Sequence, residues 1–80
     1  MVIDMFTYNI SKAADNKVFR NACAKIEAKV KGITKEDLLT DVDGSLIQVY
    51  STPEGNIRIF NDYEVDAVYA DSEVNLSKVL

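Results

Sequence analysis

Residues 46–61 read LIQVYSTPEGNIRIFN, two runs rich in β-branched and aromatic residues around the segment Thr52-Pro53-Glu54-Gly55. Proline presets the backbone of the first turn position, and glycine accepts the positive φ that a tight turn requires. The stretch therefore predicts an antiparallel hairpin with strands over about 46–51 and 57–61. The rest of the chain must supply further strands for this sheet and a layer that covers it.

The region before the hairpin has a helical period. Four apolar residues recur with the spacing of one helix face: Phe19, Cys23, Ile26 and Val30. We predict a long helix over about 11–31. Ser11 is the favoured N-cap, with Asp15 or Asn16 as a later start, and Gly32 marks the end.

Two further elements flank the long helix in the sequence. Residues 2–8 are rich in β-formers and predict a strand that is buried on both faces and lies at the centre or the edge of the sheet. After the helix, Thr34 resembles a new N-cap, and Ile33 and Leu38 occupy the positions of a hydrophobic staple. A short helix over roughly 35–41, ended by Gly44, is the prediction.

The C-terminal part predicts one more strand and an ambiguous tail. Residues 64–70 place Val65, Ala67 and Tyr69 on one face of a strand. The tail favours a helix capped by Asp71 or Ser72, and a strand over 74–78 is the alternative. The predicted fold is therefore α+β, a single domain over 1–80. One long helix packs on a small antiparallel sheet of about four strands, in the order β-α-(α)-β-β-β-(α).

The composition excludes several classes of function. The 80 residues include no histidine, which removes the usual zinc ligand and the usual member of catalytic triads. Cys23 is the one cysteine, so no internal disulfide can form, and its place on the apolar stripe predicts a core side chain. We expect no catalytic residue, no metal and no cofactor. Without a signal segment or a membrane-length apolar run, we expect a soluble chain in the cytoplasm, or in the host cytoplasm if a phage encodes it.

The segment from Leu38 to Leu46 reads LLTDVDGSL and resembles the first motif of the haloacid dehalogenase superfamily of phosphatases. The resemblance implies Asp41 as a nucleophile and Asp43 as an acid–base. That family places the motif after a buried parallel strand of a much larger domain, whereas here a predicted helix start precedes it. The segment therefore predicts a turn formed by aspartate and glycine. Nor does either register of an EF-hand loop fit its acids.

Four aromatic residues gather in the strand region: Tyr50, Phe60, Tyr63 and Tyr69. Aromatic residues on a sheet can stack nucleic-acid bases when basic residues lie between them. Residues 33–80 carry three cations and ten acids, a net charge of −7, whereas residues 1–32 carry +3. Phosphates would be repelled, so we expect core and cross-strand pairs and no direct binding of nucleic acid.

The acids predict the functional face. Five of them fall within twelve residues: Asp62, Glu64, Asp66, Asp71 and Glu73. The first three alternate, so a strand beginning at residue 62 would place them on one face. This pattern is typical of a charged, solvated sheet edge or of a binding face for a basic partner.

The functional hypothesis is a small acidic protein without catalytic activity that covers a basic surface of a nucleic-acid-binding protein. Inhibitors of this kind include phage-type anti-defence proteins such as anti-CRISPR proteins, and immunity proteins against nucleases. The alternative is a homo-oligomeric structural or regulatory subunit with no nucleic-acid-related target. Its copies would pair through an edge strand, or through the acidic face and a helix row formed by Lys17, Lys25 and Lys29. No membrane partner is expected.

Overall fold

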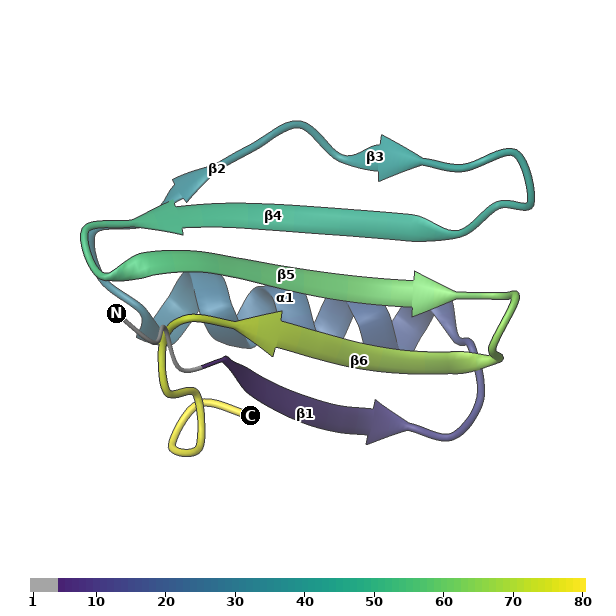
Figure 1. The fold of residues 1–80 in the computed structure, drawn as a ribbon, viewed down its shortest axis with the longest axis horizontal. Coiled ribbons are helices and arrows are strands. Elements are labelled where there is room, and N and C mark those ends of the chain that lie inside the picture. Colours follow the sequence, from purple (N-terminus) through teal and green to yellow (C-terminus); the bar gives the residue numbers. More distant parts are fainter. Residues whose placement is uncertain (1–4) are drawn as a thin grey trace.

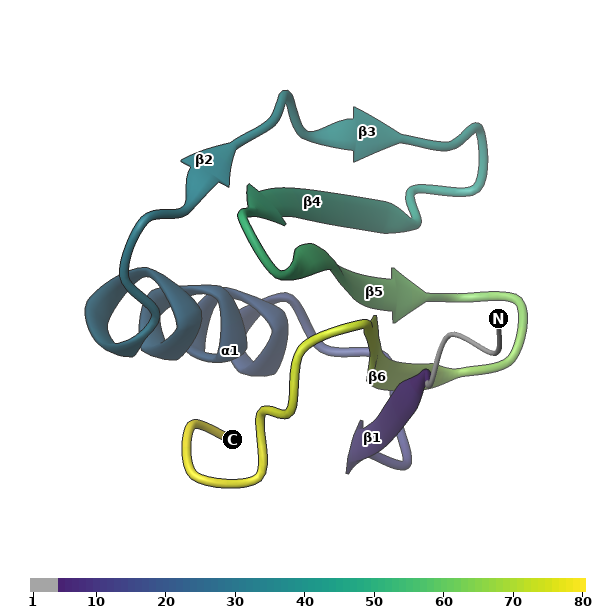
Figure 2. The ribbon, with the colours of Figure 1, turned by 60° about the vertical axis from the view of Figure 1, so that its left-hand side comes forward.

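The computed structural model describes residues 5–80 and shows one helix on one face of an antiparallel sheet (Figures 1 and 2). The strand order is β1-β6-β5-β4-β2, and β3 also pairs with β4. In chain order the elements are β1 (Phe6–Ser11), α1 (Asn16–Lys29), β2 (Thr34–Lys35), β3 (Leu39–Thr40), β4 (Leu46–Thr52), β5 (Gly55–Asp62) and β6 (Ala67–Ser72).

The predicted α+β class is confirmed, but the number of strands differs. The sheet has six strands, of which β2 and β3 contain only two residues each. The four longer strands correspond to the expected sheet of about four. The two short strands follow one another along the outer edge of β4, so the difference is confined to one edge of the sheet (Figure 1).

The hairpin predicted over residues 46–61 is confirmed as β4 and β5. Thr52 pairs with Gly55 at the turn, and its hydroxyl accepts hydrogen bonds from the backbone N–H groups of Glu54 and Gly55. Gly55 has φ +143°, and a Cβ added there would lie 2.6 Å from the Cβ of Glu73. Only glycine fits this position, because the end of β6 passes directly over it.

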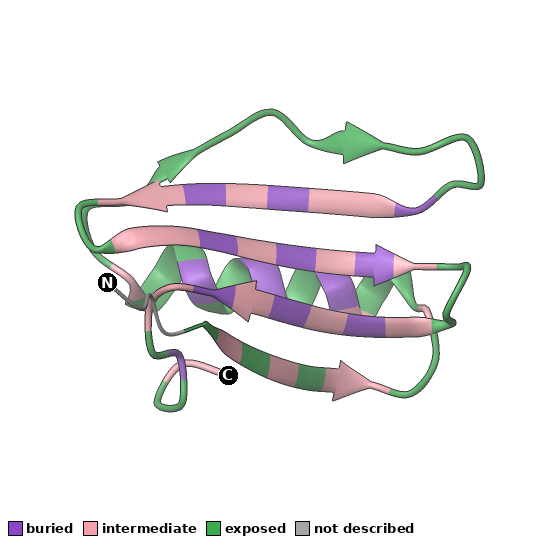
Figure 3. Cartoon of the chain, in the orientation of Figure 1, coloured by how far each residue is buried: buried purple, intermediate pink, exposed green. Residues whose placement is uncertain are grey.

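The core forms between α1 and the inner face of the sheet. Along β4, β5 and β6, buried residues alternate with half-buried ones, as Figure 3 shows. Since successive side chains of a strand point to opposite faces, the buried set faces the helix. The inner side chains that meet the helical stripe are Tyr50, Ile57, Ile59, Val68 and Ala70, and those of the stripe are Phe19, Ala22, Cys23 and Ile26.

The long helix is confirmed, but it begins later than the favoured prediction. Its N-cap is Asp15, whose carboxylate accepts hydrogen bonds from the N–H groups of Lys17 and Val18. Ser11 ends β1 instead, and its hydroxyl accepts a bond from the N–H of Ala13. Asp15 satisfies two helix-end donors at once, which explains why the later start is preferred.

The predicted short helix over 35–41 is wrong. Thr34 and Lys35 pair with β4, the N–H of Glu36 donates to the carbonyl of Val49, and β3 pairs with β4 further along. A helix of one or two turns is marginal in water, whereas the edge of β4 offers backbone partners for the whole segment. The predicted staple does not form, because Leu38 is exposed.

The first strand lies at an edge of the sheet and is not buried on both faces as predicted. β1 pairs only with β6, and its outward-facing Thr7 and Asn9 are exposed. The predicted strand began at residue 2, and residues 2–4 lie outside the described part of the chain. An edge strand with one covered face explains why half of its side chains are polar.

The C-terminal predictions are corrected at both ends. β6 begins at Ala67, because residues 63–66 form a turn in which Asp66 has φ 55°. The tail after Ser72 is neither the favoured helix nor a strand. It makes one turn, in which the N–H groups of Val79 and Leu80 donate to the carbonyl of Leu76. Leu76 is fully buried, so one side chain anchors the tail to the core.

A buried tyrosine connects the helix, the sheet and the β2 edge. The hydroxyl of Tyr50, which is fully buried, donates to Oε2 of Glu27 at 2.6 Å. The same carboxylate oxygen lies 3.4 Å from Nζ of Lys35. The hydrogen bond from Tyr50 is the main cause that lowers the pKa of Glu27, with a further contribution from Lys35.

We predict that Tyr50→Phe lowers the free energy of unfolding by about 1–2 kcal/mol at neutral pH, because Glu27 loses its donor. Glu27 has a lowered pKa in the folded state, so its stabilising effect is present above its ordinary pKa of 4.5 and is lost as the pH falls through the folded value. Urea unfolding should therefore show a smaller difference in the free energy of unfolding between Tyr50→Phe and the unmodified protein at acidic pH than at neutral pH.

Tyr63→Phe is the matched control, because the Tyr63 hydroxyl makes only an exposed 3.3 Å bond to Asn16. This variant should change stability little. An equal loss for Tyr50→Phe at both pH values would mean that packing, and not the bond to the carboxylate, accounts for it.

Candidate functional site

The face of the sheet opposite α1 is the candidate site, because its side chains do not pack into the core. A continuous cross-strand row runs over this face: Leu39, Ile47, Phe60, Tyr69 and Asn9. In Figure 1 this face is turned toward the reader and α1 lies behind the sheet. The three residues in the middle of the row are Ile47, Phe60 and Tyr69. They are half-buried, and the side chains next to them in the sheet are what covers them.

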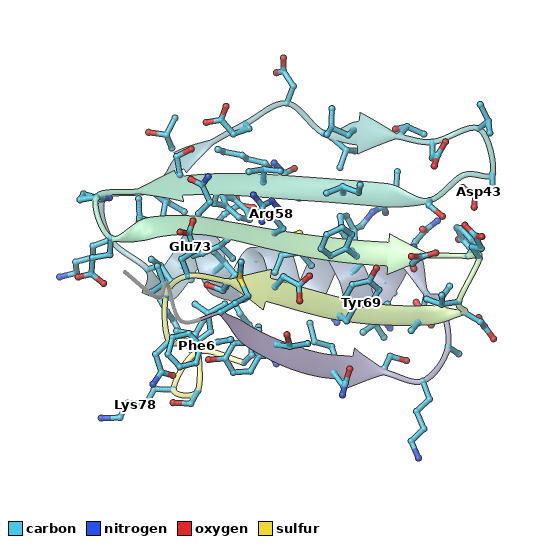
Figure 4. All side chains as sticks on the ribbon, viewed as in Figure 1. Phe6, Asp43, Arg58, Tyr69, Glu73 and Lys78 are labelled. Atoms are coloured by element: carbon cyan, nitrogen blue, oxygen red, sulfur yellow. The ribbon has the colours of Figure 1, made fainter. Side chains whose placement is uncertain are left out.

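Phe60 and Tyr69 form the centre of the row. Their ring centroids lie 4.6 Å apart with an interplanar angle of 14°, which is a stacked pair. The hydroxyl of Tyr69 donates to Oδ2 of Asp62 at 3.0 Å. Partial burial and this bond raise the pKa of Tyr69 to about 12, so the hydroxyl stays protonated at neutral pH. Figure 4 labels Tyr69 on this side of β6.

Carboxylates from two turns lie at one end of this aromatic pair. The β3–β4 turn contributes Asp41 and Asp43, and the end of β5 with the β5–β6 turn contributes Asp62 and Glu64. Together with Phe60, Tyr69 and neighbouring strand residues, these four acids line a shallow hollow of about 120 Å³. Four carboxylates beside two aromatic faces form a local site of negative potential.

Hydrogen bonds hold the two turns in place. The buried Ser45 donates its N–H to Oδ1 of Asp43 at 2.8 Å, and its hydroxyl accepts the N–H of Tyr63 at 2.9 Å. The bonds from Ser45 lower the pKa of Asp43, which keeps that carboxylate ionised. Oδ1 of Asp62 accepts the N–H of Glu64 at 2.9 Å. The backbone of both turns is therefore held in place before any partner arrives, and with it the positions from which the acids project.

The sequence-predicted acids are only partly brought together. The expectation that Asp62, Glu64 and Asp66 alternate along one strand is wrong, because the strand begins after them, at Ala67. Asp62 and Glu64 both line the hollow. Asp66 lies in the same turn, but its carboxylate accepts the N–H of Ala14 at 2.9 Å in the loop before α1. Asp66 therefore stabilises the loop before α1 and does not line the hollow.

The other two predicted acids lie outside the hollow, Asp71 further along the same open face and Glu73 at the opposite end of the sheet. Asp71 is on the outer face of β6, opposite Arg58 on β5, and accepts a bond from the hydroxyl of Thr7 at 3.1 Å. Glu73 follows β6 at the opposite end of the sheet, where its Oε1 accepts the N–H of Asn56 at 3.0 Å. Figure 4 shows Glu73 and Asp43 at opposite ends of the open face.

Sequence reasoning missed the role of Asp41 and Asp43. The expected core and cross-strand aromatic pairs are confirmed by the buried Tyr50 and by the half-buried pair of Phe60 and Tyr69. The aspartates were interpreted as turn formers, and that interpretation is confirmed: the N–H of Asp41 donates to the carbonyl of Ser45, and that of Gly44 to the carbonyl of Asp41. The alternation of β5 could have shown that Phe60 points away from Ile59. No signal in the sequence placed the two turns side by side.

The structure also locates the other candidate groups. Cys23 is buried on the helix, as predicted, and burial is the main cause that raises the pKa of its thiol. Within residues 5–80, no three side chains of histidine, cysteine, aspartate or glutamate are grouped to hold a metal ion. No helix of the described residues is long and apolar enough to cross a membrane.

Comparisons with protein-family models, with curated proteins and with solved structures found no match to this chain. Its function is therefore argued from the open face itself.

We predict that Tyr69 ionises late in an alkaline titration followed by ultraviolet absorbance. Its pKa of about 12 lies above the ordinary value of 10.0. Because folding raises this pKa, the protonated Tyr69 hydroxyl makes its full contribution to stability below pH 10. That contribution is lost as the pH rises toward 12. Asp62→Asn should lower this pKa toward 10.0, because it removes the negative charge beside the hydroxyl.

Subtracting the titration of Tyr69→Phe identifies the contribution of this tyrosine. Asp71→Asn is the matched control and should shift the pKa less, since Asp71 is the weakest of the causes that raise it. A Tyr69 that ionises near pH 10 in the unmodified protein would contradict the geometry of the Asp62 bond.

Proposed function

We propose that this chain is a small acidic binding protein without catalytic activity that inhibits a nucleic-acid-handling protein by covering its basic surface. The supporting observation is the cluster of four carboxylates at one end of the open face, which lines one hollow together with the Phe60–Tyr69 stack. Phage-type anti-defence proteins, including anti-CRISPR proteins, and nuclease immunity proteins are the classes that fit this proposal.

The chemistry of the open face favours arginine and lysine side chains of a partner. A guanidinium or ammonium group is attracted to carboxylates and to the face of an aromatic ring. The hollow of about 120 Å³ has the volume of about four water molecules, room for the end of one such side chain. The flanking apolar residues Leu39 and Ile47 would add the desolvated contact that an interface core needs.

The hollow is too small to enclose a metabolite, because small-molecule sites usually occupy roughly 300–1,000 Å³. A broad, shallow surface suits another macromolecule better. The opposite side of the molecule carries exposed cations on α1, among them Lys17, Arg20 and Lys25. This polarity would turn the sheet face, and not the helix, toward a basic partner during encounter.

The test is inhibition of purified nucleases and RNA-guided nucleases, each assayed with and without the protein. We expect at least one to be inhibited, with inhibition that weakens as salt concentration rises. Glu64→Lys should raise the concentration needed for half inhibition about tenfold, which corresponds to about 1.4 kcal/mol. Glu64 is the best position because its carboxylate accepts no hydrogen bond within residues 5–80, so thermal stability should stay unchanged.

Glu54→Lys is the matched control. Glu54 is an exposed acid in the β4–β5 turn, at the other end of the sheet, and the same reversal there should leave inhibition intact. Inhibition that is insensitive to salt, or equally weakened by both reversals, would contradict the proposed face. So would the absence of inhibition across the whole set of enzymes.

A further inference from the structure

The edge strand β1 carries neither a charge nor a proline, and its one irregularity lies at its C-terminal end. Edge strands carry unpaired backbone groups, and proteins guard them with charges, proline or interruptions. The segment from Met5 to Ser11 contains no charged residue and no proline. Its pairing with β6 is regular from Phe6 to Asn9, and the register shift lies beyond, between Asn9 and Ser11.

The opposite edge of the sheet is guarded in the expected way. There β2 and β3 are two residues long and are separated by Glu36, Asp37 and Leu38. Charges and a break in the strand leave no long run of free backbone groups on that side. The contrast indicates that β1 is the edge beside which another strand can pair.

A groove runs along β1 on the helix side. It has a volume of about 670 Å³ and is lined by strand, helix and tail residues, including Tyr8, Ile10, Val18, Ala22 and Leu80. All but Ala22 are only half-buried although they pack against the core. A strand added beside β1 would extend the sheet and place alternate side chains over this groove.

We propose that the occupant of this edge is a second copy of the chain, with β1 pairing antiparallel to β1 of the other copy about a two-fold axis. An uncharged strand complements itself without repulsion. In an antiparallel register centred on Tyr8, Thr7 of each copy faces Asn9 of the other, and the two Tyr8 residues face each other, all within the regular part of the strand. Each of these pairs joins residues of the same face, as a shared sheet requires.

The dimer has a geometric consequence for the open face. A two-fold axis that relates antiparallel strands of one sheet is perpendicular to that sheet, so both helices lie on one side. Both Phe60–Tyr69 stacks then lie on the other side, on one continuous sheet. The dimer would present two acidic faces side by side, although its formation does not depend on the proposed inhibition.

The test is the mass of the purified protein across a concentration series, by sedimentation or light scattering. We expect the mass to rise from the monomer value of 8.9 kDa toward twice that value. The double variant Thr7→Lys/Asn9→Lys should remain monomeric, because lysines would face each other across the two-fold axis. Both positions are exposed and lie on the outer face, so thermal unfolding should confirm that the variant folds.

Thr34→Lys/Thr40→Lys is the matched control, with the same charges added to exposed positions on the β2–β3 edge. It should dimerise like the unmodified chain, as should Glu64→Lys, which separates this inference from the proposed function. A monomer mass up to ~1 mM would overturn the proposal, since that limit corresponds to a Kd too weak to matter. Equal loss of dimer in both lysine pairs would overturn it too.

Discussion

The structure depends on one constraint: a single helix of fourteen residues has to cover a six-stranded sheet, and it can cover only one face. The alternating side chains of β4, β5 and β6 are therefore divided strictly between the face that α1 covers and the open face. Ile57 and Ile59 meet the helix and are fully buried, while Arg58 and Phe60 between and after them point to the open side. A one-residue slip in register would exchange the two sets and leave the helix without a core. The open face exists because the core is built from one side.

That open face is organised before binding. The turns that carry its acids are fixed by backbone hydrogen bonds, and Ser45 joins the β3–β4 turn to the β5–β6 turn. The hydroxyl of Tyr69 donates a hydrogen bond to Asp62, and its ring stacks on the ring of Phe60. Fixed turns and stacked rings lose little freedom on association, which favours affinity from a small surface. The cations on α1 lie on the other side, so the molecule is electrically polar across its thickness.

The sequence predicts local structure well wherever one periodic pattern meets a clear end signal. The hairpin around Pro53 and Gly55 and the stripe from Phe19 to Val30 are of this kind. The predictions fail where a distant neighbour decides. Residues 35–41 resemble a capped helix, but the free edge of β4 turns them into two short strands. In the candidate site, Asp62 and Glu64 were predicted, whereas Asp41 and Asp43 join them only because two turns meet at one end of the sheet.

If the protein inhibits as proposed, the side chains around Phe60 and Tyr69 contact the partner, and side-chain oxidative footprinting measures this contact. The protein would be labelled alone and then in complex with an enzyme that it inhibits. We expect labelling of Phe60 and Tyr69 to fall on binding, while labelling of Val18 on the helix side stays unchanged. Protection confined to the helix side, with Phe60 and Tyr69 still labelled in the complex, would contradict it.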